Sequence, residues 1–174
     1  DQGVVADVAA PGVTELDGWL AAHDDAPVPG PLLLLDGVTN PANVGMVIRT
    51  ATAAGLAGII LPRAGCPDLG PLVIKASAGV AFRATVLRAA TAADAARSLR
   101  DAGAALIGLR GGDAPSLFTA DLPAPAAYVL GNESEGVSAA VAGLVDGWRT
   151  IPMAGRVESL NIAVAAGVLC FELA

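Results

Sequence analysis

Short apolar runs alternate with amphipathic stretches along most of the chain. Six of the runs have the length of β-strands, and most of them consist of Leu, Ile, Val and Ala without an apolar–polar alternation. Such runs are typical of parallel strands that are buried on both faces, because helices cover a parallel sheet on both sides. The predicted strands span residues 32–35, 58–61, 84–87, 104–109, 126–130 and 148–151.

The stretches between the strands predict helices. Asn40 and Pro41 are residue types favoured at the N-cap and at the first position of a helix, and apolar side chains follow them at the spacing of one helical stripe. Two further helices are predicted over residues 71–78 and 92–102. The final one, residues 159–173, is apolar nearly all round, so we expect it to be buried. The sequence therefore predicts an α/β fold, a parallel sheet with helices on both faces.

The first 30 residues have a different character. Prolines surround one short amphipathic piece, residues 13–22, and we interpret this segment as a linker with one or two helical turns. The chain has 174 residues, a length that suits one domain with a sizeable core. We therefore assign residues 1–30 to a linker and residues 31–174 to a single α/β domain.

Hydropathy raises the question of a membrane segment, because 54% of the residues are hydrophobic and the mean hydropathy is +0.61. A helix that spans a bilayer needs roughly 20 mainly apolar residues. The longest apolar run, residues 162–171, has half that length, and no basic segment followed by an apolar one opens the chain. We expect a soluble cytoplasmic protein without a membrane partner.

Charge and cysteine usage exclude several classes of protein. The net charge of −7 argues against a stand-alone nucleic-acid binder, since phosphate contacts need clustered cations. Any RNA contact would use a few arginines, a partner subunit or a further piece of chain.

Cys66 and Cys170 lie far apart and form neither a disulfide framework nor a zinc signature. Cys170 falls in an apolar helical run, which favours a buried thiol.

Other common catalytic arrangements are also missing from the sequence. His23 is the only histidine and lies in the predicted linker, so a Ser-His-Asp triad is not expected. Neither a G-x-G-x-x-G motif after the first strand nor a phosphate-binding G-x-x-x-x-G-K-[ST] loop is present. No spacing of metal ligands occurs either.

Ligands of parallel α/β sheets bind at the carboxyl ends of the strands, so the loops after the strands hold the candidate residues. After the first strand, Arg49 points about 150° away from the apolar stripe of its helix, at about 100° per residue. Three interpretations are open for its side chain: contact with a phosphate, contact with a partner subunit, or exposure to solvent alone. Asn43 is either a site residue or a polar residue of the first helical turn.

Two later loops offer similar choices. Gly131 and Gly136 permit close approach of a ligand to the backbone, and between them Glu133 and Glu135 accept hydrogen bonds from a ribose or favour the N-terminus of a helix near residue 137. Ser159 and Asn161 either cap the last helix or face a ligand. The flexible residues 109–112 offer amide contacts at the end of another strand.

Taken together, these loops resemble the three motifs of the SpoU/TrmH class of the SPOUT methyltransferase superfamily. The matches occur in the order of the family, each after a strand, and the resemblance covers about residues 31–174. They are N-x-G-x-x-x-R-T-A at residues 43–51, L-G-N-E-x-E-G at 130–136 and I-P-M-x-G-x-x-E-S-L-N at 151–161, with K-A-S-A-G at 75–79 as an intermediate segment.

The resemblance implies a fold and an activity. The family fold is a parallel sheet with a C-terminal deep trefoil knot, a rare exception among topologies. The implied activity is S-adenosylmethionine-dependent 2′-O-methylation of a ribose in RNA, with rRNA favoured over tRNA, by a homodimer without a metal. The opening residues resemble the junction after an N-terminal RNA-binding domain that many members carry. The alternatives are a catalytically silent RNA-binding or ribosome-assembly module and, from the α/β pattern alone, a dinucleotide-binding oxidoreductase.

The resemblance also assigns roles to residues of this chain. Arg49 matches the catalytic arginine of the family, and because an ordinary arginine stays protonated, we expect it to orient the 2′-hydroxyl and to stabilise developing alkoxide charge. The other residues implied for catalysis are Asn43, Glu133, Ser159 and Asn161. The residues implied for binding of S-adenosylmethionine are Gly131, Ile151, Leu160, Leu109, Gly111 and Met153.

Overall fold

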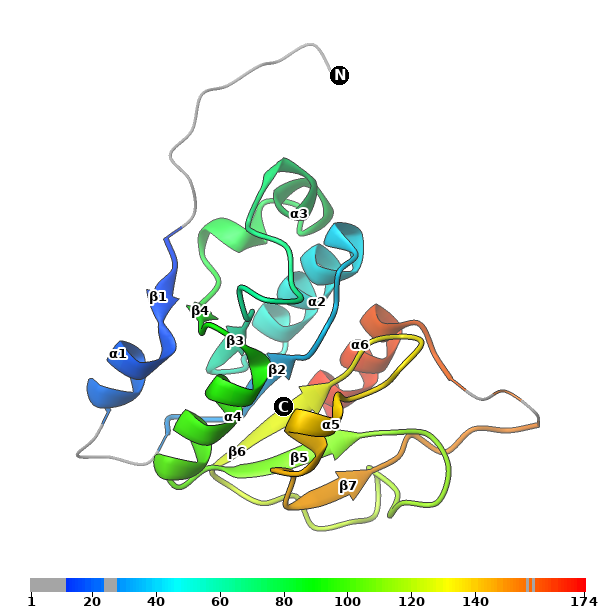
Figure 1. Cartoon of the computed structure of the whole chain (residues 1–174). Coiled ribbons are helices and arrows are strands. Elements are labelled where there is room, and N and C mark those ends of the chain that lie inside the picture. Colours follow the sequence, from blue (N-terminus) through cyan, green and yellow to red (C-terminus); the bar gives the residue numbers. More distant parts are fainter. Residues whose placement is uncertain (1–11, 24–27, 156, 158) are drawn as a thin grey trace.

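A computed structural model describes residues 12–23, 28–155, 157 and 159–174 of the chain. In this part of the chain, seven parallel strands form one sheet in the order β1-β4-β3-β2-β6-β5-β7 (Figure 1). The sheet confirms the predicted parallel α/β class. Its strands are β1 (Thr14–Glu15), β2 (Leu32–Leu35), β3 (Gly58–Ile60), β4 (Val86–Arg88), β5 (Ala105–Leu109), β6 (Ala126–Leu130) and β7 (Gly147–Arg149).

Helices cover both faces of the sheet (Figure 1). Alternate residues of each strand point to opposite faces, and the buried residues form two apolar clusters, one on each side. The first cluster packs under α2 (Pro41–Ala53), α3 (Pro71–Ala76) and α6 (Ile162–Glu172), and the short 3₁₀ helix η1 (Val80–Phe82) follows α3. The second packs under α1 (Leu16–Ala21), α4 (Ala92–Asp101) and α5 (Ala139–Ala142).

Strand β2 is the centre of the fold. All four of its leucines are completely buried, and it pairs with β3 on one side and with β6 on the other. The chain runs outward from β2 through β3 to β4, then crosses to β5 and returns to β6. The direction of winding therefore changes between β2 and β6, and ligands of open α/β sheets bind near such a point.

Helix α2 begins as the sequence predicts. The side chain of Asn40 accepts a 2.9 Å hydrogen bond from the amide of Ala42, with Pro41 at the first helical position. Gly45 then brings α2 into backbone contact with α3, because a Cβ atom on Gly45 would lie 2.5 Å from the carbonyl oxygen of Val73. Only glycine permits this distance between the two helices.

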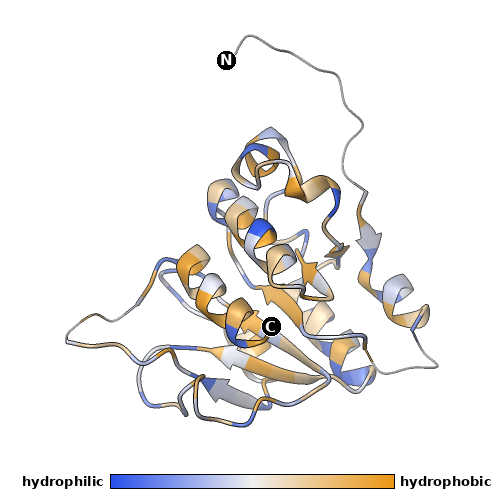
Figure 2. Cartoon of the chain, turned by 180° about the vertical axis from the view of Figure 1, so that it is seen from behind, coloured by the Kyte–Doolittle hydropathy of each residue, from blue (hydrophilic) through white to orange (hydrophobic). Residues whose placement is uncertain are grey.

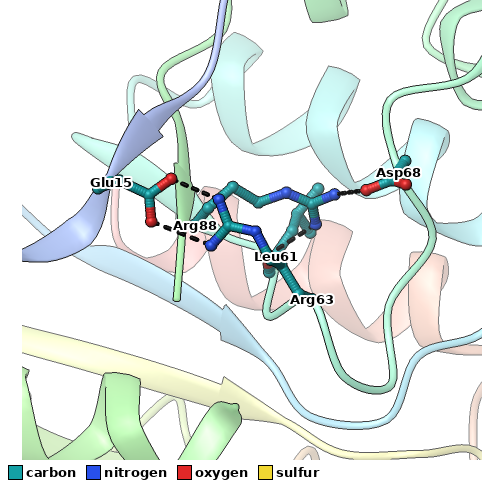
Figure 3. A network of polar contacts seen from close by, with 5 residues as sticks. All are labelled: Glu15, Leu61, Arg63, Asp68 and Arg88. Atoms are coloured by element: carbon teal, nitrogen blue, oxygen red, sulfur yellow. Dashed lines mark hydrogen bonds and ion pairs between the residues drawn. The ribbon is translucent and has the colours of Figure 1, made fainter. Parts of the chain in front are cut away.

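The segment predicted to be a linker contributes to the fold. Thr14 and Glu15 pair with β4, and Leu16 of α1 is 1% exposed in the second apolar cluster. Glu15 also accepts two hydrogen bonds from the guanidinium of Arg63, which follows β3 (Figure 3). Residues 14–21 are thus part of the α/β layers, while residues 1–11 and 24–27 of the predicted linker lie outside the described residues.

Helix α6 departs from the expectation of complete burial. Its residues Ile162, Ala166, Leu169 and Cys170 pack against the sheet, but Val164 is 53% and Phe171 62% exposed. The expectation is wrong for this outer face, because a helix that covers a single sheet has one side turned away from it. Figure 2 shows hydrophobic colouring along most of α6.

Both cysteines are free thiols, and Cys170 is buried as predicted. Burial raises the pKa of both thiols, that of Cys170 to about 12. No helix among the described residues is both long and apolar enough to cross a membrane.

Candidate functional site

A cavity of about 170 Å³ lies at the carboxyl ends of β5 and β6. It is bounded by the last residues of these strands and their loops, by the segment that follows β7 and by the start of α6. The structure brings together around it all six residues that the sequence analysis associates with cofactor binding. They are Leu109, Gly111, Gly131, Ile151, Met153 and Leu160.

The walls of the cavity combine apolar side chains with exposed backbone. Leu130, Ile151, Leu160 and Ile162 supply apolar surface, whereas the glycines of the β5 and β6 loops leave peptide groups uncovered. Such a surface suits a flat heterocycle, which packs against apolar groups with its faces and exchanges hydrogen bonds with peptide groups at its edge.

The loop after β6 closes tightly on itself. The amide of Asn132 donates to the carbonyl of Gly136, and the amide of Gly136 donates back, each over 2.9 Å. A Cβ atom on Gly131 would lie only 2.1 Å from the carbonyl carbon of Gly136 and 2.2 Å from the nitrogen of Val137. Glycine is therefore the residue that this loop accepts at position 131 without a backbone shift.

The side chain of Asn132 fixes this loop and was not predicted as a site residue. Its amide donates 2.8 Å to the carbonyl of Gly37, and its oxygen accepts from the amides of Ser134 (2.8 Å) and Glu135 (3.2 Å). Asn132 also lines the cavity. The signal in the sequence is an Asn between Gly131 and Glu133, because Asn side chains commonly close turns on their own backbone.

The buried carboxylate of Asp36 supplies a second anchor. It lies at the end of β2 and accepts a 2.7 Å hydrogen bond from the amide of Ser138. Ser138, rather than either glutamate, caps the short helix α5, which begins at Ala139. Glu133 and Glu135 therefore do not occupy the first turn of that helix, which removes the structural alternative considered for them.

A chain of hydrogen bonds connects three predicted catalytic residues. The side-chain amide of Asn43, which is 6% exposed at the start of α2, donates to the carboxylate of Glu133 at the edge of the cavity. The amide of Asn161 donates to the oxygen of Asn43 over 3.3 Å. Asn161 also caps α6 by accepting from the amide of Ala163, so its structural and its proposed catalytic roles are compatible.

The two remaining predicted residues differ in position. Ser159 lines the cavity, and no side-chain hydrogen bond from it to another described residue is found. Arg49 is exposed on α2 and is not among the residues that line the cavity. It lies six residues after Asn43, about 9 Å along the helix axis at about 1.5 Å per residue.

An arginine and a tryptophan flank the cavity on the β7 side. Arg110 lines the cavity, and its guanidinium carbon lies 5.1 Å from the centre of the Trp148 ring, a distance typical of a cation–π contact. The Trp148 ring lies across β5 at Gly108, where a Cβ atom would come within 2.5 Å of it. The sequence analysis included Arg110 only in a segment expected to offer backbone amides, and it did not identify Trp148. No group of three His, Cys, Asp or Glu side chains that is suited to a metal ion occurs in the described part of the chain.

Comparisons with known proteins point in one direction. Residues 30–171 match the model of the SpoU rRNA Methylase family. The chain is 38% identical over 174 residues to the 23S rRNA (guanosine-2′-O-)-methyltransferase RlmB of Xanthomonas axonopodis pv. citri, a match that covers 98% of this chain and 69% of that protein.

Solved structures with bound S-adenosylmethionine (AdoMet) are also similar. The AdoMet-bound rRNA methyltransferase of Sinorhizobium meliloti is 31% identical, with a TM-score of 0.80 over 93% of this chain. The SpoU methyltransferase AviRb of Streptomyces viridochromogenes in complex with AdoMet is 31% identical, with a TM-score of 0.73 over 84% of this chain. The chain spans 60% of the length of each of these two proteins.

Proposed function

Because this chain belongs to the SpoU rRNA methylase family, we propose that the cavity at the carboxyl ends of β5 and β6 is the active site of its RNA ribose 2′-O-methyltransferase activity. The enzyme uses S-adenosylmethionine as methyl donor. The observation that carries the assignment of the cavity is the convergence of three separate loops on it, at the edge of the sheet where α/β folds bind ligands.

The residues around the cavity fit the methyl donor. Leu130, Ile151 and Leu160 offer apolar contacts to the adenine, and the backbone at Gly111 and Gly131 offers it hydrogen bonds. The fixed loop of residues 131–136 holds this surface in place before the donor binds. When bound, the donor supplies a methyl group from its sulfonium, and the rest of the donor leaves as a neutral thioether.

The polar residues at the edge of the cavity orient the ribose. Glu133 holds the amide of Asn43, and Asn43 in turn accepts from Asn161, so the three side chains form a rigid polar edge next to Ser159. A fixed edge keeps the 2′-hydroxyl close to the methyl group, and such proximity supplies a large part of the acceleration. Arg49 stabilises the developing alkoxide with its charge while the 2′-hydroxyl loses its proton to solvent.

The position of Arg49 outside the cavity supports a homodimeric enzyme. Arg49 and Met46 are both exposed on α2, and Val164 and Phe171 are exposed on the neighbouring helix α6. An exposed apolar face of this kind favours contact with a second copy of the chain. In the dimer, the α2 helix of one subunit brings its Arg49 to the cavity of the other.

The relatives suggest further properties of the chain. We assign to it the C-terminal trefoil knot of the family fold. The substrate is an rRNA, in keeping with the relative that methylates a guanosine of 23S rRNA, and the enzyme acts in the cytoplasm, where rRNA is available.

Two measurements test this proposal. Calorimetry should detect S-adenosylmethionine binding, with NAD as a negative control for the dinucleotide-binding alternative. A methyl-transfer assay on rRNA and tRNA, followed by mapping of 2′-O-methyl groups, should locate the product. Donor binding without methyl transfer to any RNA would favour the silent RNA-binding alternative, and the absence of donor binding would refute the assignment of the cavity.

A further inference from the structure

The positive charges of this acidic chain are concentrated in one stretch. Between Asp36 and Asp94 the sequence contains five cationic side chains and one acidic side chain, Asp68. The rest of the chain contains five cationic and sixteen acidic side chains. The cationic stretch comprises α2, β3, α3, η1 and β4, so a chain with a net charge of −7 has one locally basic part.

Two of the five cations are neutralised within the fold (Figure 3). Arg63 forms an ion pair with Glu15. Arg88 is 4% exposed, donates to the carbonyl of Leu61 over 2.8 Å and pairs with Asp68. These arginines hold β1 and the loop after β3 in place, so their charge is not available to a partner.

Of the other three cations, Arg49 on α2 belongs to the proposed methyl-transfer site, and the remaining two lie on α3 and directly after η1. Lys75 is exposed in the last turn of α3, and Arg83 is exposed directly after η1. Neither forms an ion pair with another residue that the structure describes. Between them, the aromatic side chain of Phe82 is 44% exposed. Two cations thus flank an exposed aromatic ring on one short segment.

This segment is held rigidly on the rest of the fold. The hydroxyl of buried Ser77 donates to the carbonyl of Ile74 (2.8 Å) and accepts from the amide of Ala81 (3.2 Å), which joins α3 to η1. The contact at Gly45 holds α3 against α2. Since Asn43, two residues before Gly45, is hydrogen-bonded to Glu133, helix α2 connects this segment directly to the edge of the cavity.

We propose that Lys75, Phe82 and Arg83 form a docking surface for RNA outside the methyl-transfer site, and this inference rests on the proposed function. Cationic side chains bind phosphates with release of counterions. An exposed aromatic ring stacks on unpaired bases, which are the usual targets of sequence-specific RNA recognition. The surface holds RNA next to α2, so that the ribose reaches the cavity.

The test compares charge removal on two faces of the sheet. The double variant Lys75→Gln/Arg83→Gln is paired with Arg97→Gln/Arg100→Gln, which removes the same charge from α4 on the opposite face. RNA affinity of the intact protein is measured by fluorescence anisotropy over a range of salt concentrations. Each phosphate contact contributes about 0.7 to 0.9 to the slope of log affinity against log salt. Loss of two contacts in the first pair should therefore reduce the magnitude of this slope by about 1.4 to 1.8. The second pair should leave the slope unchanged.

The variant Phe82→Ala tests the stacking contact. It should weaken binding of an unpaired RNA about tenfold, since one stacked base contributes on the order of a factor of ten, and leave binding of a duplex unchanged. The turnover number at saturating RNA should stay at the wild-type value in all these variants. The KM for RNA should rise only in the α3–η1 variants, that is, those at Lys75, Phe82 and Arg83.

The outcomes separate the docking surface from the active site. Wild-type RNA affinity in the α3–η1 variants would overturn the docking surface and leave the methyltransferase assignment intact. Salt-dependent RNA binding through Lys75 and Arg83 without methyl transfer would support the surface and refute the proposed activity. A change of sedimentation mass in these variants, with RNA affinity unaltered, would show that the segment contacts a second copy of the chain and would also overturn the proposal.

Discussion

The side-chain amide of Asn43 donates a 2.5 Å hydrogen bond to the carboxylate of Glu133, which lies 90 residues later in the chain. The contact joins the start of α2 to the loop after β6 and is itself braced by Asn161. Asn43 is nearly buried, so loss of its partners would leave polar atoms unsatisfied. This bond couples the stability of the fold to the geometry of the proposed site.

Replacement of Asn43 by Asp should make stability depend on pH. The variant places a second carboxyl group beside Glu133, and of two adjacent carboxyl groups one keeps its proton to a higher pH than normal. Because the unfolded chain releases this proton freely, stability should fall as the pH rises from about 4 to 7. We expect a deficit of about 1 to 3 kcal/mol at pH 7, measured by urea denaturation.

The variant Asn43→Ala is the control for this effect. It removes the same hydrogen bonds and adds no charge, so its deficit relative to wild type should be similar at pH 5 and pH 7. If the deficit of Asn43→Asp were equally independent of pH, the proximity of residues 43 and 133 would be disproved.

Replacement of Arg49 by Ala should separate binding from turnover. Since Arg49 is assigned to stabilise charge that develops on the ribose only during methyl transfer, the affinity for S-adenosylmethionine should be unchanged. Turnover should fall about 10²- to 10³-fold, the usual effect of removing one group that stabilises developing negative charge. Arg97→Ala, an exposed arginine on α4, serves as the control. Unchanged turnover in Arg49→Ala would remove Arg49 from the mechanism.

Replacement of Gly131 by Ala should impair donor binding. The added methyl group would collide with the backbone of Gly136 and Val137, and the loop at the cavity would have to move. We expect at least a tenfold weaker affinity in calorimetry. Gly143→Ala is the matched control, since Gly143 has an ordinary φ of −69° and the nearest atom to its added Cβ is 3.6 Å away. Equal affinities for the two variants would contradict the role of the loop.

Cys170 should contribute a loss of stability at alkaline pH. Burial raises the pKa of its thiol to about 12, whereas a cysteine in an unfolded chain has a pKa of about 8.5. Between these values only the unfolded state releases the proton, so stability falls with rising pH, by up to about 1.4 kcal/mol per pH unit. Guanidinium denaturation of wild type and Cys170→Ala between pH 8 and 11 measures this. Parallel pH profiles would show that the buried thiol does not titrate in this way.

The sequence predicts the strands well because burial on both faces leaves a continuous apolar run. Leu32–Leu35 and Ala126–Leu130 are found with the predicted bounds. The strand β1 has no such signal: Thr14 and Glu15 are exposed and polar, and their place depends on pairing with β4 and on Arg63. Hydropathy also cannot tell whether an apolar helix packs fully inside its own chain, which is why the exposed face of α6 was not foreseen.

The sequence predicts the residues of the candidate site from local motifs, but it does not predict the contacts that hold them in place. The motifs identified residues that the fold brings to one cavity, since each follows a strand of the same sheet. The anchoring of Asn132 to Gly37 and the contact of Gly45 with α3 depend on segments that are distant in sequence. No spacing within one segment reveals such contacts.

Trp148 gives the protein an intrinsic optical signal close to the donor cavity. Its ring packs on Arg110, which lines the cavity, whereas the other tryptophan, Trp19, lies in α1, next to β1 and β4 and far from the β7 edge of the sheet. Occupancy of the cavity should therefore alter the emission of one fluorophore and spare the other. A titration of Trp19→Phe with S-adenosylmethionine should retain the spectral change that Trp148→Phe loses, so binding can be followed in solution without a label.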